Sequence, residues 1–234
     1  MASRELPLMP IPSRDPMRRL TPAATLATIA LAALAGIVDA LAFQSLGGFF
    51  ASFMSGNSTR LGLGLAQGWN GAAATAAALI LAFVCGAMLG TIAGAAATER
   101  LGAHRRGEAV MGLVTVLLAI AAALTAFAPL PLALLPLAVA MGAQNGVVAE
   151  DGEVRVALTY MTGTLVRIGQ RLARRLLGEA AAPGLRAELL LWLGFVAGVT
   201  IGAIGWHWLG LAMLWVAAAI AALLTMAVAR TGLR

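Results

Sequence analysis

The sequence predicts an all-α polytopic membrane protein with six transmembrane helices and two re-entrant or half-helix segments. Three observations lead to this fold class. Of the 234 residues, 61% are hydrophobic and only 11% are charged, and the mean hydropathy is +0.91. A soluble domain carries about 25% charged residues, so a soluble enzyme, a disordered chain and a nucleic-acid-binding domain are excluded. The third observation is a two-fold internal repeat, predicted to be inverted.

Six apolar segments are long enough to cross about 30 Å of hydrocarbon, and a helix satisfies its backbone polar groups internally. They are 22–44, 72–97, 109–128, 132–149, 187–207 and 211–229. Two further segments, 48–68 and 157–178, are semi-apolar and carry polar residues and arginine. Whether these two cross fully stays open. Residues 1–20 contain four prolines and are predicted to form a cytoplasmic arm.

The repeat divides the remaining chain into a first membrane half, 21–130, and a second, 131–234. Three blocks recur in the same order with nearly constant spacing. They pair 54–62 with 161–169, 83–90 with 195–202, and Gly36 and Asp39 with Gly142 and Asn145.

The arginines predict the topology. With six spans, 15 of the 16 arginines fall on one side and only Arg60 on the other. Eight spans would leave ten inside and four outside. The positive-inside rule therefore favours six spans with both termini cytoplasmic. Three spans per half force opposite orientations, an arrangement that many secondary transporters use.

Two polar motifs, Ser55-Gly56-Asn57-Ser58-Thr59 and Thr162-Gly163-Thr164, suggest a substrate site. Glycine permits non-helical dihedrals, and hydroxyl and amide groups bind ligands or satisfy freed backbone groups. Entering from opposite faces, the motifs would meet near the midplane as broken helices do. The alternative is a polar loop followed by a surface helix. The candidate substrate-binding residues are Ser55, Gly56, Asn57, Thr59, Thr162, Gly163, Thr164, Gln144 and Asn145.

Three charged residues are candidates for coupling: Asp39, Arg60 and Arg167. A carboxylate in hydrocarbon is costly, so Asp39 within the first span either couples a proton or cation or caps a helix near the outer interface. Arg60 and Arg167 are equivalent in the repeat. They would neutralise an anion or pair with Asp39, unless they snorkel from helix ends.

The second motif continues into a basic amphipathic helix, 165–177. On a helical wheel, the arginines cluster opposite apolar residues. The two sets are Arg167, Arg171, Arg174 and Arg175 against Leu165, Ile168, Leu172 and Leu176. This pattern predicts a helix at the inner membrane surface with its arginines facing headgroups.

Glycine recurs at every fourth position on two predicted spans, which favours close helix packing and leaves room for a homo-oligomer. The positions are 86, 90, 94, 194, 198 and 202. No catalytic constellation is recognisable, since Asp39 has no nearby histidine or second acid and Cys85 has no base. We therefore expect no enzyme activity, no metal and no cofactor.

Two signatures resemble those of the YoaK-like bacterial inner-membrane proteins, a family of unknown function. The first comprises Gly36-Ile37-Val38-Asp39-Ala40, Phe43, Leu46-Gly47-Gly48-Phe49 and Met54-Ser55-Gly56-Asn57. The second comprises Met141-Gly142-Ala143-Gln144-Asn145 and Thr159-Tyr160-Met161-Thr162-Gly163-Thr164-Leu165. The chain departs from the family pattern at Ser55 and Ser58, where threonine is usual, and at Gly146 and the acidic stretch 150–153. The resemblance implies a bacterial inner-membrane protein and supplies no activity.

The leading expectation is a small-solute or ion transporter with a polar site between the two halves. A non-transporting scaffold or regulator acting through 165–177 and a passive channel are the alternatives. The expected partners are the lipid bilayer and a small-molecule or ion substrate, with no nucleic acid.

Overall fold

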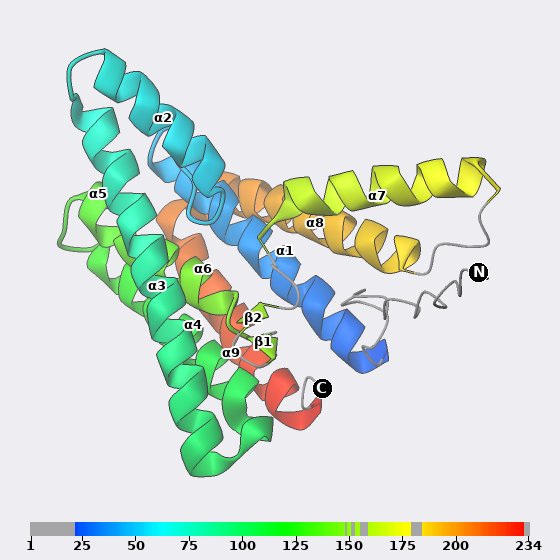
Figure 1. Ribbon diagram of the computed structural model, residues 1–234. Helices are drawn as coiled ribbons and strands as arrows, with labels where there is room; N and C mark the ends of the chain where they lie inside the picture. Colours follow the sequence, from blue (N-terminus) through cyan, green and yellow to red (C-terminus); the bar gives the residue numbers. More distant parts are fainter. Residues whose placement is uncertain (1–21, 148, 151–152, 155–158, 179–183, 232–234) are drawn as a thin grey trace, which may run out of the picture.

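The computed structural model describes residues 22–231 apart from 148, 151–152, 155–158 and 179–183 (Figure 1). The described residues are helical except for connecting loops and one two-stranded antiparallel ribbon. The long and short α-helices are α1 (Pro22–Ser45), α2 (Met54–Ala66), α3 (Gly71–Leu101), α4 (Arg106–Leu124), α5 (Leu130–Ala133), α6 (Leu135–Gln144), α7 (Met161–Leu176), α8 (Leu185–Leu209) and α9 (Met213–Thr231). The remaining elements are the 3-10 turns η2 (Ala103–Arg105) and η3 (Gly210–Ala212) and the strands β1 (Ala149–Glu150) and β2 (Glu153–Val154). The predicted all-α class is confirmed.

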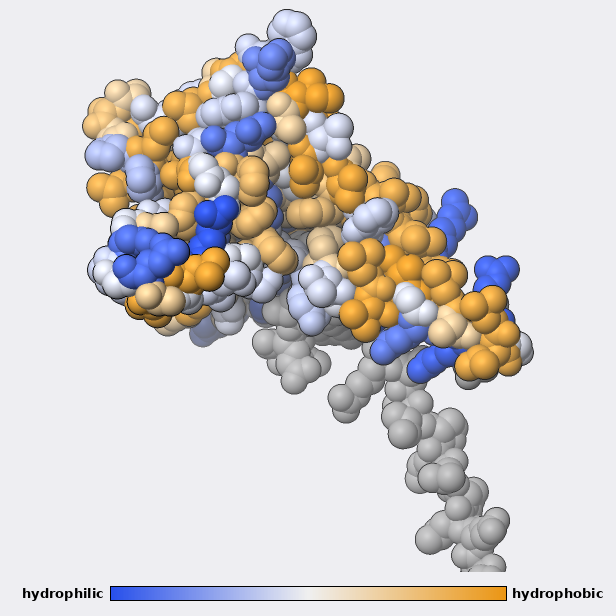
Figure 2. Space-filling view, turned by 90° about the horizontal axis from the view of Figure 1, so that it is seen from above, coloured by the Kyte–Doolittle hydropathy of each residue, from blue (hydrophilic) through white to orange (hydrophobic). Residues whose placement is uncertain are grey.

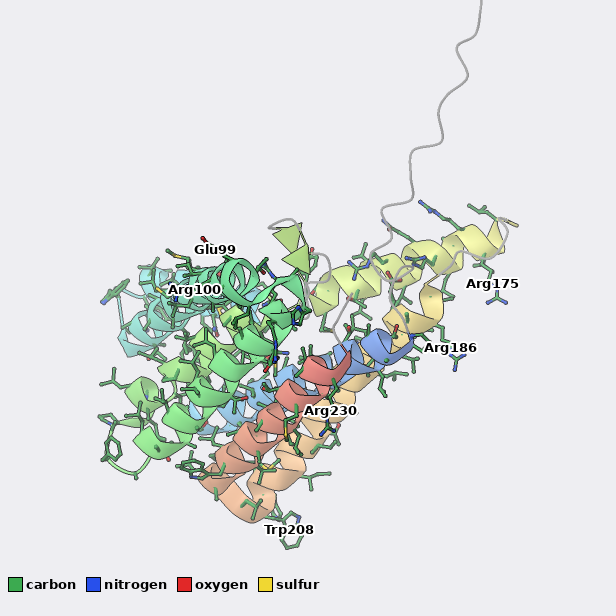
Figure 3. The ribbon with its side chains drawn as sticks, turned by 90° about the horizontal axis from the view of Figure 1, so that it is seen from below. Glu99, Arg100, Arg175, Arg186, Trp208 and Arg230 are labelled. Atoms are coloured by element: carbon green, nitrogen blue, oxygen red, sulfur yellow. The ribbon has the colours of Figure 1, made fainter. Side chains whose placement is uncertain are left out.

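Four helical stretches are long and apolar enough to cross a membrane. They are Pro22–Ser45, Gly71–Leu101, Ala103–Leu124 and Leu185–Arg230. The last stretch contains both α8 and α9, and Figure 3 shows the chain turning back between them at the end that carries Trp208. Gly210 in this turn has φ +54°, a left-handed conformation that glycine adopts readily.

The predicted span 132–149 is shorter in the structure. Residues 130–144 form two short helices, α5 and α6, and each has a proline in its first two positions. Proline fits the first turn of a helix but not its interior, so Pro136 begins a new helix instead of continuing the first. Together they extend about 22 Å at 1.5 Å per residue, less than the hydrocarbon thickness of about 30 Å.

The helices pack in three principal pairs: α1 with α8, α3 with α6, and α4 with α9. Glycine allows the close contact of α1 and α8. Gly198 and Gly202 lie against the backbone at Ala33 and Ile37, and a Cβ at position 202 would lie 2.8 Å from the Ile37 carbonyl oxygen. A side chain there would separate the two helices, as expected for small residues at membrane helix interfaces.

The contact of α3 with α6 has the same construction. Gly86 and Gly90 of α3 lie against Val139 and Ala143 of α6, and a Cβ at position 90 would lie 2.6 Å from the Ala143 carbonyl oxygen. The predicted close packing at these glycines is therefore observed in both pairs.

Helices α2 and α7 are too short to cross a membrane, with 13 and 16 residues. Helix α2 packs on α3, whereas α7 packs on α8. Figure 1 shows α2 (cyan) at one side of the molecule and α7 (yellow-green) projecting at the other. The polar motifs thus begin two short helices that rest on different long ones.

Candidate functional site

The loop 46–53 between α1 and α2 returns alongside α1 and is held there by Asp39. One carboxylate oxygen accepts hydrogen bonds from the backbone N–H of Ala51 (2.9 Å) and of Ser52 (2.7 Å). The other accepts from the Ser52 hydroxyl (2.6 Å). Asp39 is buried and lies six residues before the end of α1 at Ser45, about 9 Å along the axis. The loop therefore re-enters the protein by that distance before α2 begins.

Asn57, in the first turn of α2, fixes the same loop from the other side. Its side-chain oxygen accepts from the Phe50 N–H (3.1 Å) and its amide nitrogen donates to the Phe50 carbonyl (2.8 Å). The side chain is fully buried. Both polar ends of Asn57 thus act as a local backbone partner, which makes it a positioning residue for the loop.

The other residues of the first motif lie on the outer side of α2. Ser55 and Thr59 are exposed, and the Thr59 hydroxyl donates to the Ser55 carbonyl one turn earlier (3.1 Å). Gly56 packs against the Phe53 and Phe50 rings, where a Cβ would lie 2.6 Å from the Phe53 ring. The exposed hydroxyls retain acceptor capacity for a ligand.

Asn145, directly after α6, makes the corresponding contact in the second half. Its amide nitrogen donates to the Met141 carbonyl (3.0 Å) and to the Thr159 hydroxyl oxygen (3.2 Å), and the Thr159 hydroxyl faces the Asn145 oxygen at 3.3 Å. Thr159 lies two residues before α7. An uncharged amide–hydroxyl pair therefore holds the entry to α7, where a carboxylate holds the entry to α2.

Gln144 connects the two halves. Its side-chain nitrogen donates to the Leu31 carbonyl of α1 (2.7 Å), and the residue is fully buried. Its side-chain oxygen has no hydrogen-bond partner among the described residues. Gln144 is thus a buried polar contact between α6 and α1 with one unused acceptor.

The second motif leads into a charged cluster between α7 and α8. The Arg167 Nε donates to one Glu188 oxygen (2.8 Å) and the Arg171 Nε to the other (2.7 Å). Arg167 also donates to the Thr164 hydroxyl oxygen (2.9 Å). Glu188 is only 1% exposed and Thr164 is fully buried. One buried carboxylate therefore binds two guanidinium groups in charge-assisted hydrogen bonds.

This cluster corrects the predicted orientation of the basic helix. Arg167 and Arg171 do not face headgroups; they face α8, because Glu188 offers a buried counter-charge. Ile168 is buried beside them, whereas Leu165 and Leu172 are exposed. Beyond the cluster, Arg174 and Arg175 are exposed, so only the end of α7 has its arginines where the helical wheel predicts them.

The remaining predicted residues take separate places. Thr162 is exposed, and Gly163 is buried beneath the Tyr160 ring. The Arg60 guanidinium lies 4.8 Å from the centre of the Phe49 ring, which replaces the pairing with Asp39 considered from the sequence. Within the described residues, no hydrogen bond links Ser55-Gly56-Asn57-Ser58-Thr59 with Thr162-Gly163-Thr164.

Sequence reasoning missed three residues. Glu188 lies at the start of the predicted span 187–207, so hydropathy alone marked it as a costly acid next to an arginine-rich segment. Ser52 and Thr159 are separated by 107 residues, the same offset as the polar motifs. That offset was the signal that could have identified them as equivalent partners of Asp39 and Asn145.

Comparisons with known proteins place this arrangement in a membrane context. The model of a protein of unknown function (DUF1275) matches residues 27–227. A UPF0700 transmembrane protein of Rhizobium meliloti (strain 1021) is 36% identical over 198 residues, covering 85% of this chain and 83% of the relative. The UPF0700 transmembrane protein YoaK of Bacillus subtilis (strain 168) is 27% identical over 144 residues, covering 61% of this chain and 64% of YoaK. No solved structure matches significantly.

Proposed function

Because the chain belongs to the DUF1275 family of transmembrane proteins, we propose that this integral membrane protein transports a small solute or ion. The resemblance to YoaK-like proteins is confirmed by the same matches. The family supplies no activity, so the proposal rests on the two re-entrant connections described above.

The proposal includes six spans in two inverted halves, with α2 and α7 as half-helices. Its support is the matched packing: α1 lies on α8 as α6 lies on α3. Gly36 of α1 contacts the Phe195 carbonyl, and Gly142 of α6 contacts the Phe83 carbonyl. The arginine distribution favours cytoplasmic termini and, in a bacterium, the inner membrane.

The observation that carries the proposal is the pair of side-chain ties ahead of the short helices. Asp39 holds Ser52, and Asn145 holds Thr159. Non-helical backbone at membrane depth is tolerated where it is buried in protein or lines a cavity. Discontinuous helices of this kind form the substrate sites of many secondary transporters.

The proposed roles of the residues follow from their contacts. Ser55, Thr59 and Thr162 offer exposed hydroxyls for a substrate. Asp39 is the coupling residue, since its protonation would remove the charge that three donors stabilise and so loosen the loop before α2. The other residues of the site position backbone or charge: Gly56, Asn57, Arg60, Gln144, Asn145, Gly163, Thr164 and Arg167.

Charge movement in proteoliposomes tests this proposal across several classes of solute. The purified protein is adsorbed on a supported membrane and exposed in turn to sodium, potassium, phosphate and single amino acids. We expect a saturable current with at least one solute, lost in Asp39→Asn and reduced in Asn57→Ala. Ser58→Ala is the matched control, since its exposed hydroxyl bonds only to its own helix at the Met54 carbonyl.

Other outcomes separate the alternatives. Current that does not saturate and ignores Asp39→Asn indicates a passive channel. Unchanged saturable current in both Asp39→Asn and Asn57→Ala overturns the site. The scaffold or regulator hypothesis is favoured by the exposed Arg174 and Arg175, and predicts no flux but loss of cellular function when these arginines are changed.

A further inference from the structure

Helix α7 and the first turns of α8 form an arm that projects from the helix bundle (Figures 1 and 3). We define the arm as residues 161–178 and 184–191. The Glu188 cluster fastens α7 to α8 within it. The arm therefore has one face fixed against α8 and another turned away from the protein.

The outward face of the arm is apolar. Four leucines form an exposed ridge along α7 and just past its end, with exposed fractions that reach 89% at Leu176 and 80% at Leu177. They are Leu165, Leu172, Leu176 and Leu177. Figure 2 shows apolar side chains (orange) over the arm and hydrophilic ones (blue) at its edges. Contiguous exposed apolar surface of this kind marks a site of interaction with protein or membrane.

The end of the arm is basic. Arg174, Arg175 and Arg186 are exposed there, and Figure 3 shows Arg175 and Arg186 at the same end. Residues 161–188 contain five arginines and two glutamates, a formal charge of +3. Glu188 is already occupied by Arg167 and Arg171, so it does not neutralise the outer arginines.

We propose that the arm binds anionic phospholipid. The leucine ridge enters the acyl-chain boundary, and Arg174, Arg175 and Arg186 bind the phosphate groups of the lipid head. A lipid is favoured over a soluble acidic protein because the ridge and the arginines occupy one amphipathic helix of a membrane-embedded chain, the usual pattern of interfacial helices. Arginine stems reach along apolar surface to place the guanidinium at headgroup level. This binding is independent of transport.

Lipid-specific fluorescence quenching tests the proposal. In full-length protein with Cys85→Ala and Leu176→Cys, the new thiol carries a fluorophore, and the protein is placed in nanodiscs of mixed phosphatidylcholine and phosphatidylglycerol. Brominated chains are put on one lipid or the other at equal mole fraction. An arginine near an anionic surface enriches anionic lipid by about fivefold, so brominated phosphatidylglycerol should quench at an at least about fivefold lower mole fraction than brominated phosphatidylcholine.

The matched variants separate this binding from general charge effects. Arg174→Gln with Arg175→Gln should abolish the lipid preference, as should about 0.5 M salt, at which the Debye length falls to about 4 Å. Arg100→Gln with Arg230→Gln should keep it, since these arginines also lie exposed in the last turns of helices. All four positions are exposed, so both pairs should fold, which gel filtration verifies.

Two results would overturn the proposal. Equal quenching by both brominated lipids would mean that the ridge contacts the bilayer without recognising a headgroup. Quenching by aqueous iodide alone would mean that the arm faces water and is free to bind a soluble acidic partner. Neither result would affect the solute-current measurement, so the two proposals fail separately.

Discussion

The entries to α2 and α7 use similar backbones but different charges. At α2, a carboxylate holds the returning loop and the helix's own arginine, Arg60, lies over an aromatic ring. At α7, an uncharged amide holds the chain, and the equivalent arginine, Arg167, binds Glu188. Each half thus has one buried carboxylate, in the loop tie of the first half and at the helix flank of the second.

This difference indicates which parts are fixed in place. Helix α7 is bound along its side by two charge-assisted contacts, while its entry is held by neutral hydrogen bonds. Helix α2 is bound chiefly at its entry, where Asp39 and Asn57 act together. A change of charge should therefore release the entry loop in the first half and the helix itself in the second.

The largest expected effect is that of Glu188→Ala. Removal of one partner from a buried ion pair costs about 3–5 kcal/mol, and we expect the lower end, about 3 kcal/mol, because the Arg167 side chain is 38% exposed and gains water. Thermal unfolding in detergent, followed by tryptophan fluorescence, measures the loss. Glu99→Ala, at an exposed position, should leave the unfolding temperature unchanged; an equal drop in both variants would contradict a special role for Glu188.

The second prediction compares the two loop ties directly. Asp39→Ala should lower the free energy of unfolding by about 2–3 kcal/mol, because three donors lose a charged acceptor. Asn145→Ala should cost about 1 kcal/mol, the typical net value of neutral hydrogen bonds. Asp39→Asn, which gives the first tie the chemistry of the second, should fall between them. Equal losses in both alanine variants would show that the charge of Asp39 adds nothing to the tie.

The third prediction concerns the other tie of the first loop. Asn57→Ala removes both hydrogen bonds to Phe50 and leaves buried backbone groups unpaired, so we expect a loss of about 1–2 kcal/mol. A cysteine placed at Ala51 in a Cys85→Ala background should also react faster with a thiol reagent. The hypothesis fails if reactivity at position 51 is the same as in Ser58→Ala.

The smallest expected effect is that of Arg60→Gln. A cation–π contact at a partly exposed site contributes about 0.5–1 kcal/mol, so the unfolding temperature should fall only slightly. Arg167→Gln should cost more, since it leaves Glu188 with one partner fewer. If the two variants lose the same stability, the electrostatic difference between the motif helices is smaller than the contacts imply.

Much of the fold follows from hydropathy. The predicted spans 22–44 and 187–207 correspond to α1 and α8 within two residues, because long apolar runs have a single way to satisfy their backbone. The fourth span was predicted too long, since Pro136 divides it and its last residues leave the helix. The count of six spans and the inverted repeat stay predictions.

The site was harder to predict, since its contacts join distant residues. The cost of burying a carboxylate identified Asp39, but its partner Ser52 depends on the path of the returning loop. The helical wheel located the arginines of α7 correctly on one face. It could not tell that Glu188, which follows Arg167 by 21 positions, would turn half of that face inward.

The glycine contacts between α1 and α8 have a consequence for biosynthesis. Ala33 and Gly198 meet backbone to backbone, yet they are 165 residues apart in the sequence. At about 5–20 residues per second, the ribosome needs roughly ten to thirty seconds to supply the second helix. During that interval, α1 is in the membrane without its partner, and the first half waits for the second before either is complete. Insertion machinery or neighbouring lipid must cover that surface until the last two helices are made.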